Sequence, residues 1–258
     1  QPDPARRWSE ALQAIAKSPR YAGARWPGGV LAPQVGLLPL EEDPRSGLGE
    51  FHMPATGAEP ARDAQGRLAR DEEGRLRLQP ETGIVFVLLP GGRVRPIEAP
   101  ASLPRHQDEW VTSFDLEPWF MAKHEMTCAQ WHRLAGTEPD PYDRFDQDLL
   151  PVSQPSWNQL SDLWSKLPGP IGFPSALQWE FAMRGGTNTI YWTGNDDESL
   201  LGAEVLKNGR TQPDTLPVGS LRANPYGLHD MLGNVTEMCG DAGASDDEFL
   251  ISEWVQEV

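Results

Sequence analysis

The first apolar pattern of the chain has the period of a helix. Four residues fall on one face of a helix predicted over residues 4–18: Trp8, Leu12, Ile15 and Ala16. Asp3 precedes this segment and is a suitable N-cap residue. From residue 19 to about residue 80 the chain is rich in proline and glycine, which indicates turns and short elements.

Within that region, two octapeptides repeat one pattern. DAQGRLAR occupies residues 63–70 and DEEGRLRL occupies residues 71–78. In each, an acidic residue is followed three positions later by glycine. We therefore expect a surface hairpin, or two successive turns, with glycine at the tips.

An uncharged run of β-branched and aromatic residues, GIVFVLL at 83–89, predicts a buried strand. Pro90-Gly91-Gly92 marks its end. Shorter runs indicate further strand-like pieces, at residues 114–120, 121–126, 190–193 and 216–220.

Three later segments begin with a capping box, in which a hydroxyl residue is followed three positions later by glutamine. The pairs are Thr127 with Gln130, Ser156 with Gln159, and Ser175 with Gln178. Each predicts a short helix with apolar residues on its inner face. Gly185 follows the third segment, where a C-cap glycine would end the helix.

The acidic segment 246–258 allows two interpretations. Ser245 and Glu248 fit a fourth capping box, and apolar residues recur behind them at helical spacing. The run FLISEWVQEV is also compatible with a strand. We favour a helix.

Composition narrows the class of protein. The 258 residues include 25 Gly and 25 Pro, a content that a long helical bundle would not tolerate. The net charge of −16 offers no basic surface for nucleic acid and disfavours anionic membranes. An acidic surface suits divalent cations or basic partners, although it also serves solubility alone.

The two cysteines, Cys128 and Cys239, are too few for a disulfide framework and form no pair of CxxC units for zinc. No run of the sequence reaches the length of a membrane span. The first residues, QPDPARRWSE, do not resemble a signal peptide, and we expect a cytoplasmic location.

The order of motifs resembles the formylglycine-generating enzyme (sulfatase-modifying factor) family. The resembling segments are GIVFVLLPGG, FMAKHEMTCAQW, PVSQPSW, FPSALQWEFAMRGG and PVGSLRANPYGLHDMLGNVTEM, which run in the family's order over residues 83–241. The resemblance implies an α+β fold, irregular and related to C-type lectins, with short capped helices and little regular sheet.

This resemblance divides the chain into three parts. Residues 1–82 are expected to form an N-terminal helix and a Pro/Gly-rich extension that packs on the main domain. Residues 83–245 are the formylglycine-generating-enzyme-like domain, and residues 246–258 are an acidic C-terminal segment. Residues 19–92 also resemble the region that joins this domain to bacterial protein kinases.

The resemblance implies a calcium site in the stretch 224–241. Its ligands would be the side chains of Asp230 and Glu237 and the backbone carbonyls of Gly233 and Val235. Hard oxygen ligands of this kind suit Ca²⁺. Asp230 and Glu237 could equally be ordinary turn and cap residues. Thr236 and Met238 replace two tryptophans of the family, which alters the groove near this stretch.

Enzymes of the family hold copper with a pair of cysteines near the C-terminal end. Cys128 and Cys239 do not match that pair, so we expect structural thiols and no copper. The resemblance then implies a pseudoenzyme domain, a ligand- or protein-binding module of a bacterial signalling or defence system. The alternative is a copper-dependent oxidase whose catalytic segment is missing from this chain or completed outside it.

Other metal and catalytic candidates are weaker. His124, Cys128 and His132 are spaced by four residues, as zinc ligands on a helix could be. Thr127 as an N-cap would place His124 outside that helix. His52, His106 and His229 have no partner visible in the sequence and are interpreted as core or surface residues.

Overall fold

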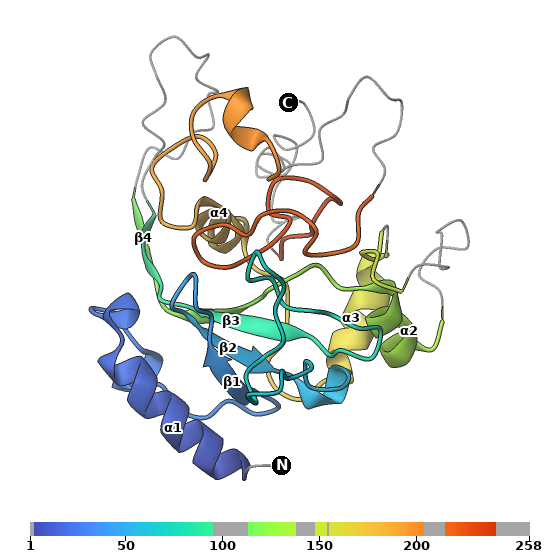
Figure 1. Cartoon of the computed structure of the whole chain (residues 1–258), viewed down its shortest axis with the longest axis horizontal. Coiled ribbons are helices and arrows are strands. Elements are labelled where there is room, and N and C mark those ends of the chain that lie inside the picture. Colours follow the sequence, from blue (N-terminus) through green and yellow to red (C-terminus); the bar gives the residue numbers. More distant parts are fainter. Residues whose placement is uncertain (1–2, 95–112, 138–147, 154, 204–214, 241–258) are drawn as a thin grey trace.

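The computed structural model describes residues 3–94, 113–137, 148–153, 155–203 and 215–240 (Figure 1). Within these residues, four α-helices and two small antiparallel sheets are joined by long irregular segments. Figure 1 shows α1 on one side of the larger sheet, α2 and α3 on the other, and α4 near the loops of residues 215–240. This mixture confirms the predicted irregular α+β class with short helices and little sheet.

Helix α1 (Pro4–Lys17) forms as predicted and packs on strand β1. Asp3 caps it, with its side chain accepting a hydrogen bond of 3.2 Å from the backbone N–H of Ala5. Trp8 and Ile15 are buried on the inner face. The indole N–H of Trp8 donates to the carbonyl of Leu37 at 3.0 Å, which fixes the helix beside the sheet.

The larger sheet has the order β1-β2-β3-β6, and all its neighbours are antiparallel. Its strands are β1 (Leu38–Glu42), β2 (Gly49–His52), β3 (Val85–Leu89) and β6 (Trp119–Ala122). β3 is central, which confirms the buried strand predicted at residues 83–89. The sheet therefore joins residues of the predicted N-terminal extension to residues of the predicted main domain.

The smaller sheet pairs β4 (Gly92–Val94) with β5 (Phe114–Leu116). The break between β5 and β6 lies at Glu117–Pro118, not between residues 120 and 121 as the sequence indicated. Pro118 has no backbone N–H to donate to a ladder, so the chain changes sheet there.

Two further predicted strands are wrong. At residues 190–193 the chain makes a tight turn, in which Tyr191 and Gly194 exchange backbone hydrogen bonds of 3.0 and 3.1 Å. At residues 216–220 the N–H of Leu216 donates to the side chain of Asn234 at 2.9 Å. Side-chain and turn bonds thus replace a strand ladder, a distinction that a short apolar run does not reveal.

The repeated octapeptides form two successive turns, as predicted. Gly66 donates its backbone N–H to the carbonyl of Asp63 at 2.9 Å, and Gly74 does the same to Asp71 at 3.0 Å. Antiparallel bridges close the turns, between Arg62 and Leu68 and between Arg70 and Leu76. Both glycines have φ of +79°, which an L-residue adopts at a cost.

All three predicted capping boxes are present, with both hydrogen bonds of each box formed. The helices are α2 (Cys128–Ala135), α3 (Trp157–Ser165) and α4 (Ala176–Arg184). α2 and α4 end at Gly136 and Gly185, both in the left-handed conformation. α2 and α3 bury a shared hydrophobic cluster that includes Trp131 and Leu163.

A buried network of charges lies between the sheet and the loop of residues 224–230. Lys123, 1% exposed, contacts Asp43 at 2.8 Å and Glu50 at 2.9 Å, and donates to the carbonyl of Gly227 at 2.6 Å. Arg70 contacts Glu50 at 2.5 Å. This network ties the turn of residues 71–74 and the sheet to the C-terminal loop.

No helix within the described ranges is long and apolar enough to cross a membrane. The predictions for residues 246–258 and for His106 lie outside the described residues. The predicted division of the chain at residue 82 stays a prediction.

Candidate functional site

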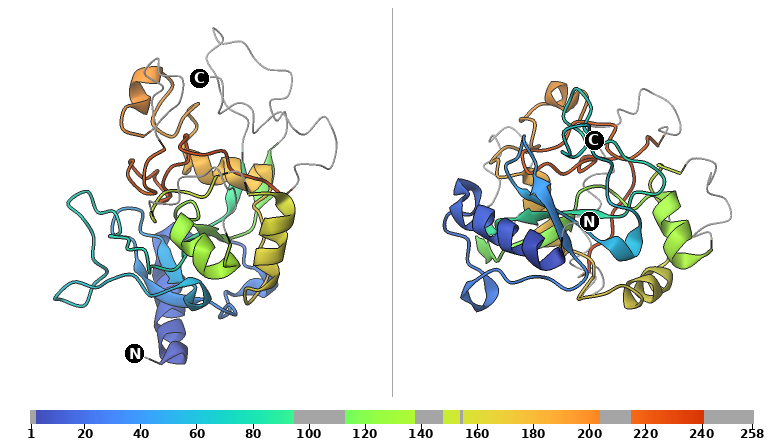
Figure 2. Two further views of the ribbon diagram at one scale, coloured as in Figure 1. Left: turned by 90° about the vertical axis from the view of Figure 1, so that its right-hand side faces the viewer. Right: turned by 60° about the horizontal axis from the view of Figure 1, so that its bottom comes forward.

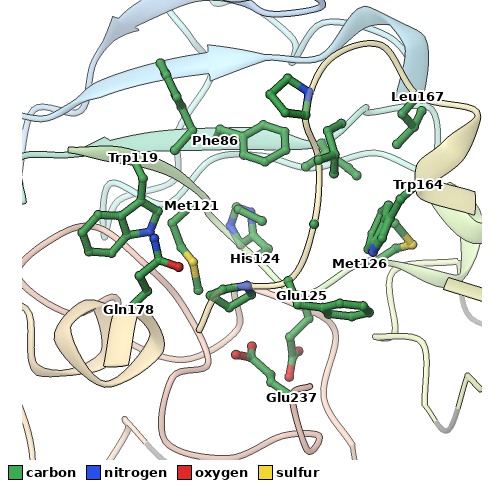
Figure 3. A pocket seen from close by; sticks show the side chains of 18 of the residues that line it. Phe86, Trp119, Met121, His124, Glu125, Met126, Trp164, Leu167, Gln178 and Glu237 are labelled. Atoms are coloured by element: carbon green, nitrogen blue, oxygen red, sulfur yellow. The ribbon is translucent and has the colours of Figure 1, made fainter. Parts of the chain in front are cut away.

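A pocket with a volume of about 640 Å³ lies where the N-terminal segment, the larger sheet, α3 and the C-terminal loop meet. Small-molecule sites in proteins commonly have volumes of 300–1,000 Å³. Figure 3 shows Trp119, Met121 and Gln178 on one side of the pocket and Met126, Trp164 and Leu167 on the other. The two further views of Figure 2 show that irregular segments make up much of the described chain between the helices and strands.

Several separate parts of the chain supply the walls. The N-terminal segment contributes Trp26, Val30 and Leu31, and β6 contributes all four of its residues. α3 contributes Leu160 and Trp164, and the segments 170–174 and 235–238 add further lining residues. Because β6 lies beside β3, the sheet positions one wall, while α3 and irregular segments supply much of the rest.

Aromatic contacts hold the walls in place. Phe173 stacks on Trp157 with ring centroids 4.5 Å apart and meets Trp164 at 6.0 Å. Trp119 packs against Phe181 of α4 at 5.3 Å. Such pairs stabilise by about 0.5–1.5 kcal/mol beyond the area that they bury. The apolar side of the pocket is therefore preformed.

Two carboxyl groups, from Glu125 and Glu237, lie next to each other at one end of the pocket (Figure 3). Glu125 accepts hydrogen bonds from the side chain of Asn234 at 2.7 Å and from the N–H of Val235 at 3.2 Å. Glu237 accepts one from the indole N–H of Trp179. Asp230 lies close enough to act on both and accepts from the N–H of Gly219 at 2.7 Å.

Burial raises the pKa of all three carboxyls. The pKa of Glu125 rises to about 9, through burial first and then through the charges of Asp230 and Glu237. Burial also raises the pKa of Glu237 to about 7 and that of Asp230 to about 6. Among the described residues, none of the three forms an ion pair with a lysine, arginine or histidine. Burial thus favours the protonated form most strongly at Glu125 and least at Asp230, and a cation beside the cluster would favour the charged forms.

His124 and His229 also line the pocket, stacked with ring centroids 4.8 Å apart. Burial lowers the pKa of His229 to about 3, and burial together with His229 lowers the pKa of His124 well below its ordinary value. The Nδ1 atom of His229 is 3.0 Å from the carbonyl of Leu221. Both rings are thus neutral at pH 7 and present no positive charge to a ligand.

Asn224, at the start of the stretch 224–241, has a structural role. Its amide donates to the carbonyls of Ala182 and Met183 at the end of α4, at 2.6 and 3.1 Å. Its side-chain oxygen accepts from the N–H groups of Tyr226 and Leu228. The following turns use left-handed backbone at Asp230, with φ +61°, and at Asn234, with φ +71°. Asn224 and these turns bring Glu237 back to the pocket wall.

The four predicted calcium ligands lie in this one loop. Val235 and Glu237 line the pocket, and Asp230 is buried beside it at 4% exposure. The donor chemistry fits a hard cation, because the two carboxyls act on each other and neither has a cationic partner among the described residues. No three His, Cys, Asp or Glu side chains in the described ranges form a metal-binding group. Because the predicted set uses two side chains and two carbonyls, it stays a prediction.

Neither cysteine is among the described residues that line the pocket. Cys128 is buried in the cluster of α2 and α3, and its Sγ lies 3.8 Å from the carbonyl of Pro151. Cys239 is also buried, and neither cysteine forms a disulfide. Thr127 caps α2, so His124 lies outside the helix, as the capping argument predicted. His52 and His229 are buried at 2% exposure, consistent with their interpretation as core or surface residues.

Glu125, and the pairing of His124 with His229, are the features of the site that sequence reasoning missed. Glu125 lies in FMAKHEMTCAQW, which is assigned from the sequence to a strand-like piece and to the family resemblance without a role for Glu125. A glutamate next to a histidine, just after a strand and before a capped helix, was the available signal. Its partner, Asn234, is 109 positions away in the sequence, so the pairing itself required the fold.

These features describe an α+β domain with a preformed apolar pocket that ends in buried acids. A family model, the sulfatase-modifying factor enzyme 1-like domain, matches residues 74–248. The chain therefore belongs to the formylglycine-generating enzyme (sulfatase-modifying factor) family, as the motif order indicated.

Two relatives illustrate the breadth of this family. A formylglycine-generating enzyme of Mycobacterium tuberculosis is 30% identical over 135 residues, which cover 48% of this chain and 43% of that protein. The serine/threonine-protein kinase pkn1 of Chlamydia caviae is 38% identical over 197 residues, which cover 68% of this chain and 30% of the kinase. The chain thus spans less than half the length of either relative.

Among solved structures, Treponema denticola variable protein 1 is similar with a TM-score of 0.45 and 19% identity. The similarity covers 61% of this chain and 73% of that chain.

Proposed function

We propose that this chain is a non-catalytic binding module of the formylglycine-generating enzyme family, and that its ligand enters the pocket between β6 and α3. The observation that carries the proposal is the preformed 640 Å³ pocket, whose lining contains aromatic and aliphatic side chains and neither cysteine. Function in such folds depends on the site rather than on the scaffold. The similarity to the pkn1 kinase supports a setting in bacterial signalling, with defence as a related setting.

A pocket-filling variant tests this proposal. Gly172 lines the pocket, and no heavy atom of the described residues lies within 4 Å of a Cβ built on it. Gly172→Leu should therefore fill space without a clash. Ala14→Leu, on the exposed face of α1, adds the same kind of group outside the pocket and serves as the control.

The readout is ligand-detected NMR with a fragment library on both variants and on the unchanged chain. We expect several fragments to bind the unchanged chain and the Ala14→Leu variant with equal affinity, and to lose binding in Gly172→Leu. Binding that survives in Gly172→Leu at full strength would place the ligand elsewhere and contradict the proposal.

A copper-dependent oxidase is the other function that the family suggests. It predicts oxygen-dependent conversion of a cysteine in a sulfatase-type peptide, with copper held by cysteine thiolates. Turnover of such a peptide by the chain after copper loading, and its loss in Cys128→Ser or Cys239→Ser, would overturn the non-catalytic proposal. We expect no turnover in any of the three proteins.

A further inference from the structure

The end of the pocket that contains Glu125 and Glu237, called the acid end, has carboxyl groups but no lysine or arginine in its described lining. Glu125 and Glu237 are the acidic residues of the pocket's described lining. A carboxylate offers about four acceptor positions. Glu125 receives two hydrogen bonds and Glu237 one, so each has acceptor capacity to spare.

Two cations that act on the pocket histidine His124 are paired with other acids. Lys123, which precedes His124 in the chain, contacts Asp43 and Glu50. Arg70 also contacts Glu50. Among the described residues, neither cation forms an ion pair with Glu125 or Glu237.

The remainder of the lining is mostly apolar and aromatic, with Gln34, Gln178, Thr236 and the two histidines as its other polar members. Trp119 and Met121 lie on one side of it and Trp164 and Met126 on the other (Figure 3). Aromatic faces attract cations as well as apolar groups. The pocket thus combines a mostly apolar lining with two acidic groups at one end.

We propose that the ligand is an organic ammonium compound with an apolar body, bound with its positive nitrogen between Glu125 and Glu237. The apolar body would lie along Trp119, Trp164 and the methionines. This inference rests on the proposed function, because it assigns the ligand class of the same pocket.

The surroundings of the two carboxyls leave room for a positive group. Asp230 is the third acid that acts on them. Asn234, Val235 and Trp179 are the groups that donate hydrogen bonds to them.

The test compares two probes of equal shape, 4-phenylbutylamine and 4-phenylbutanol, by isothermal titration calorimetry on the full chain at pH 7.5. The first is positively charged at this pH and the second is neutral. We expect the amine to bind about tenfold more tightly or better, since hydrogen bonds to charged groups exceed those between neutral groups.

Variants locate the positive nitrogen. Glu125→Gln and Glu237→Gln should each reduce affinity for the amine about tenfold and leave affinity for the alcohol unchanged. Asp162→Asn, at an exposed position of α3, removes a carboxyl outside the pocket and should change neither. The unchanged alcohol affinity shows that the variants keep their folded pocket.

The outcomes separate this inference from the proposed function. Equal affinity for both probes, or an amine affinity that survives in both glutamine variants, would overturn the ammonium assignment while leaving a binding pocket in place. Failure of both probes, together with fragments that bind Gly172→Leu normally, would contradict both proposals. Displacement of the amine by calcium alone, lost in Asp230→Asn, would identify the acid end as a divalent cation site and overturn the assignment.

Discussion

The side-chain amide of Asn234 donates a hydrogen bond of 2.7 Å to Glu125, 109 positions earlier in the chain. The same amide donates to the carbonyl of Leu216, and its oxygen accepts from the N–H of Leu216. One side chain thus joins the pocket acid, the loop of residue 216 and the turn that carries the predicted calcium ligands. The backbone of Asn234 has a φ of +71°, a conformation that asparagine adopts more readily than most other residues.

Removal of this amide should destabilise the domain. Asn234→Ala deletes three hydrogen bonds, one of them to a carboxyl. It also places alanine, which adopts the left-handed conformation less readily than asparagine, at a position with positive φ. We expect a loss of about 2 kcal/mol or more in the free energy of unfolding. Asn234→Gly, which relieves the backbone, should lose less. Urea denaturation measures both, with the exposed Asn158→Ala as control; equal stability of all three variants would contradict this role.

The buried lysine offers a second prediction. Lys123→Met keeps most of the side-chain volume but leaves Asp43 and Glu50 without their shared ammonium group. Breaking a buried ion pair from one side typically costs about 3–5 kcal/mol. We expect a loss of that size by chemical denaturation, against a change near zero for Lys17→Met on the exposed end of α1. A small loss for Lys123→Met would mean that water reaches the network.

Stability should fall as pH rises through the neutral range. The pKa of Glu125 is about 9 in the folded chain, above its ordinary value of 4.5, so the folded state binds more protons between these values. The stabilisation is therefore complete below about pH 4.5 and is lost as pH rises toward 9. The raised pKa values of Glu237 and Asp230 also lower stability as pH rises, over narrower pH ranges that end near 7 and near 6.

The free energy of unfolding measured at pH 5.5, 7 and 8.5 checks this sign. Glu125→Gln, which mimics the protonated acid, should flatten the decline, whereas Glu81→Gln at an exposed position should not. Asp43 has the opposite effect on stability. Burial alone would raise its pKa, but Lys123 holds the pKa below its ordinary value, so its contribution to the free energy of unfolding is lost on acidification. A Glu125→Gln variant with the same pH slope as the unchanged chain would rule out Glu125 as the source.

Calcium gives a fourth prediction. If Asp230 and Glu237 hold Ca²⁺ with the carbonyls of Gly233 and Val235, added Ca²⁺ raises the melting temperature and chelation lowers it. Asp230→Asn and Glu237→Gln should each abolish the difference between the two conditions, while Asp162→Asn preserves it. The comparison is made within each variant, because removal of a buried acid changes stability by itself. If the melting temperature of the unchanged chain is the same with calcium and with chelator, the predicted calcium site is wrong.

Local signals predicted the local structure well. The capping boxes at Thr127, Ser156 and Ser175 specify helix starts through residues three positions apart, and all three form. The run at 190–193 is not a strand because Tyr191 and Gly194 close a local turn, and the run at 216–220 is not one because its partner Asn234 lies elsewhere in the sequence. The order of the motifs was sufficient to identify the family, because several short segments, each recognisable in the sequence, occur in the family's order.

The site was only partly predictable for the same reason. Asp230 and Glu237 lie in one recognisable loop, so their proximity followed from the motif. Glu125 joins them from a segment more than a hundred residues earlier, and the raised pKa values come from burial that the sequence does not show. The pocket itself arises from several separate parts of the chain, and none of them indicates a pocket when it is considered alone.

The matched family domain begins at residue 74, but the pocket does not. Trp26, Val30 and Leu31 form part of its wall, and β1 and β2 complete the sheet on which β6 rests. A recombinant fragment cut at the family boundary would lose that wall and expose the edge of β3. The ligand preference of this chain can therefore depend on residues that precede the matched family domain, and a fragment used for binding measurements needs to include them.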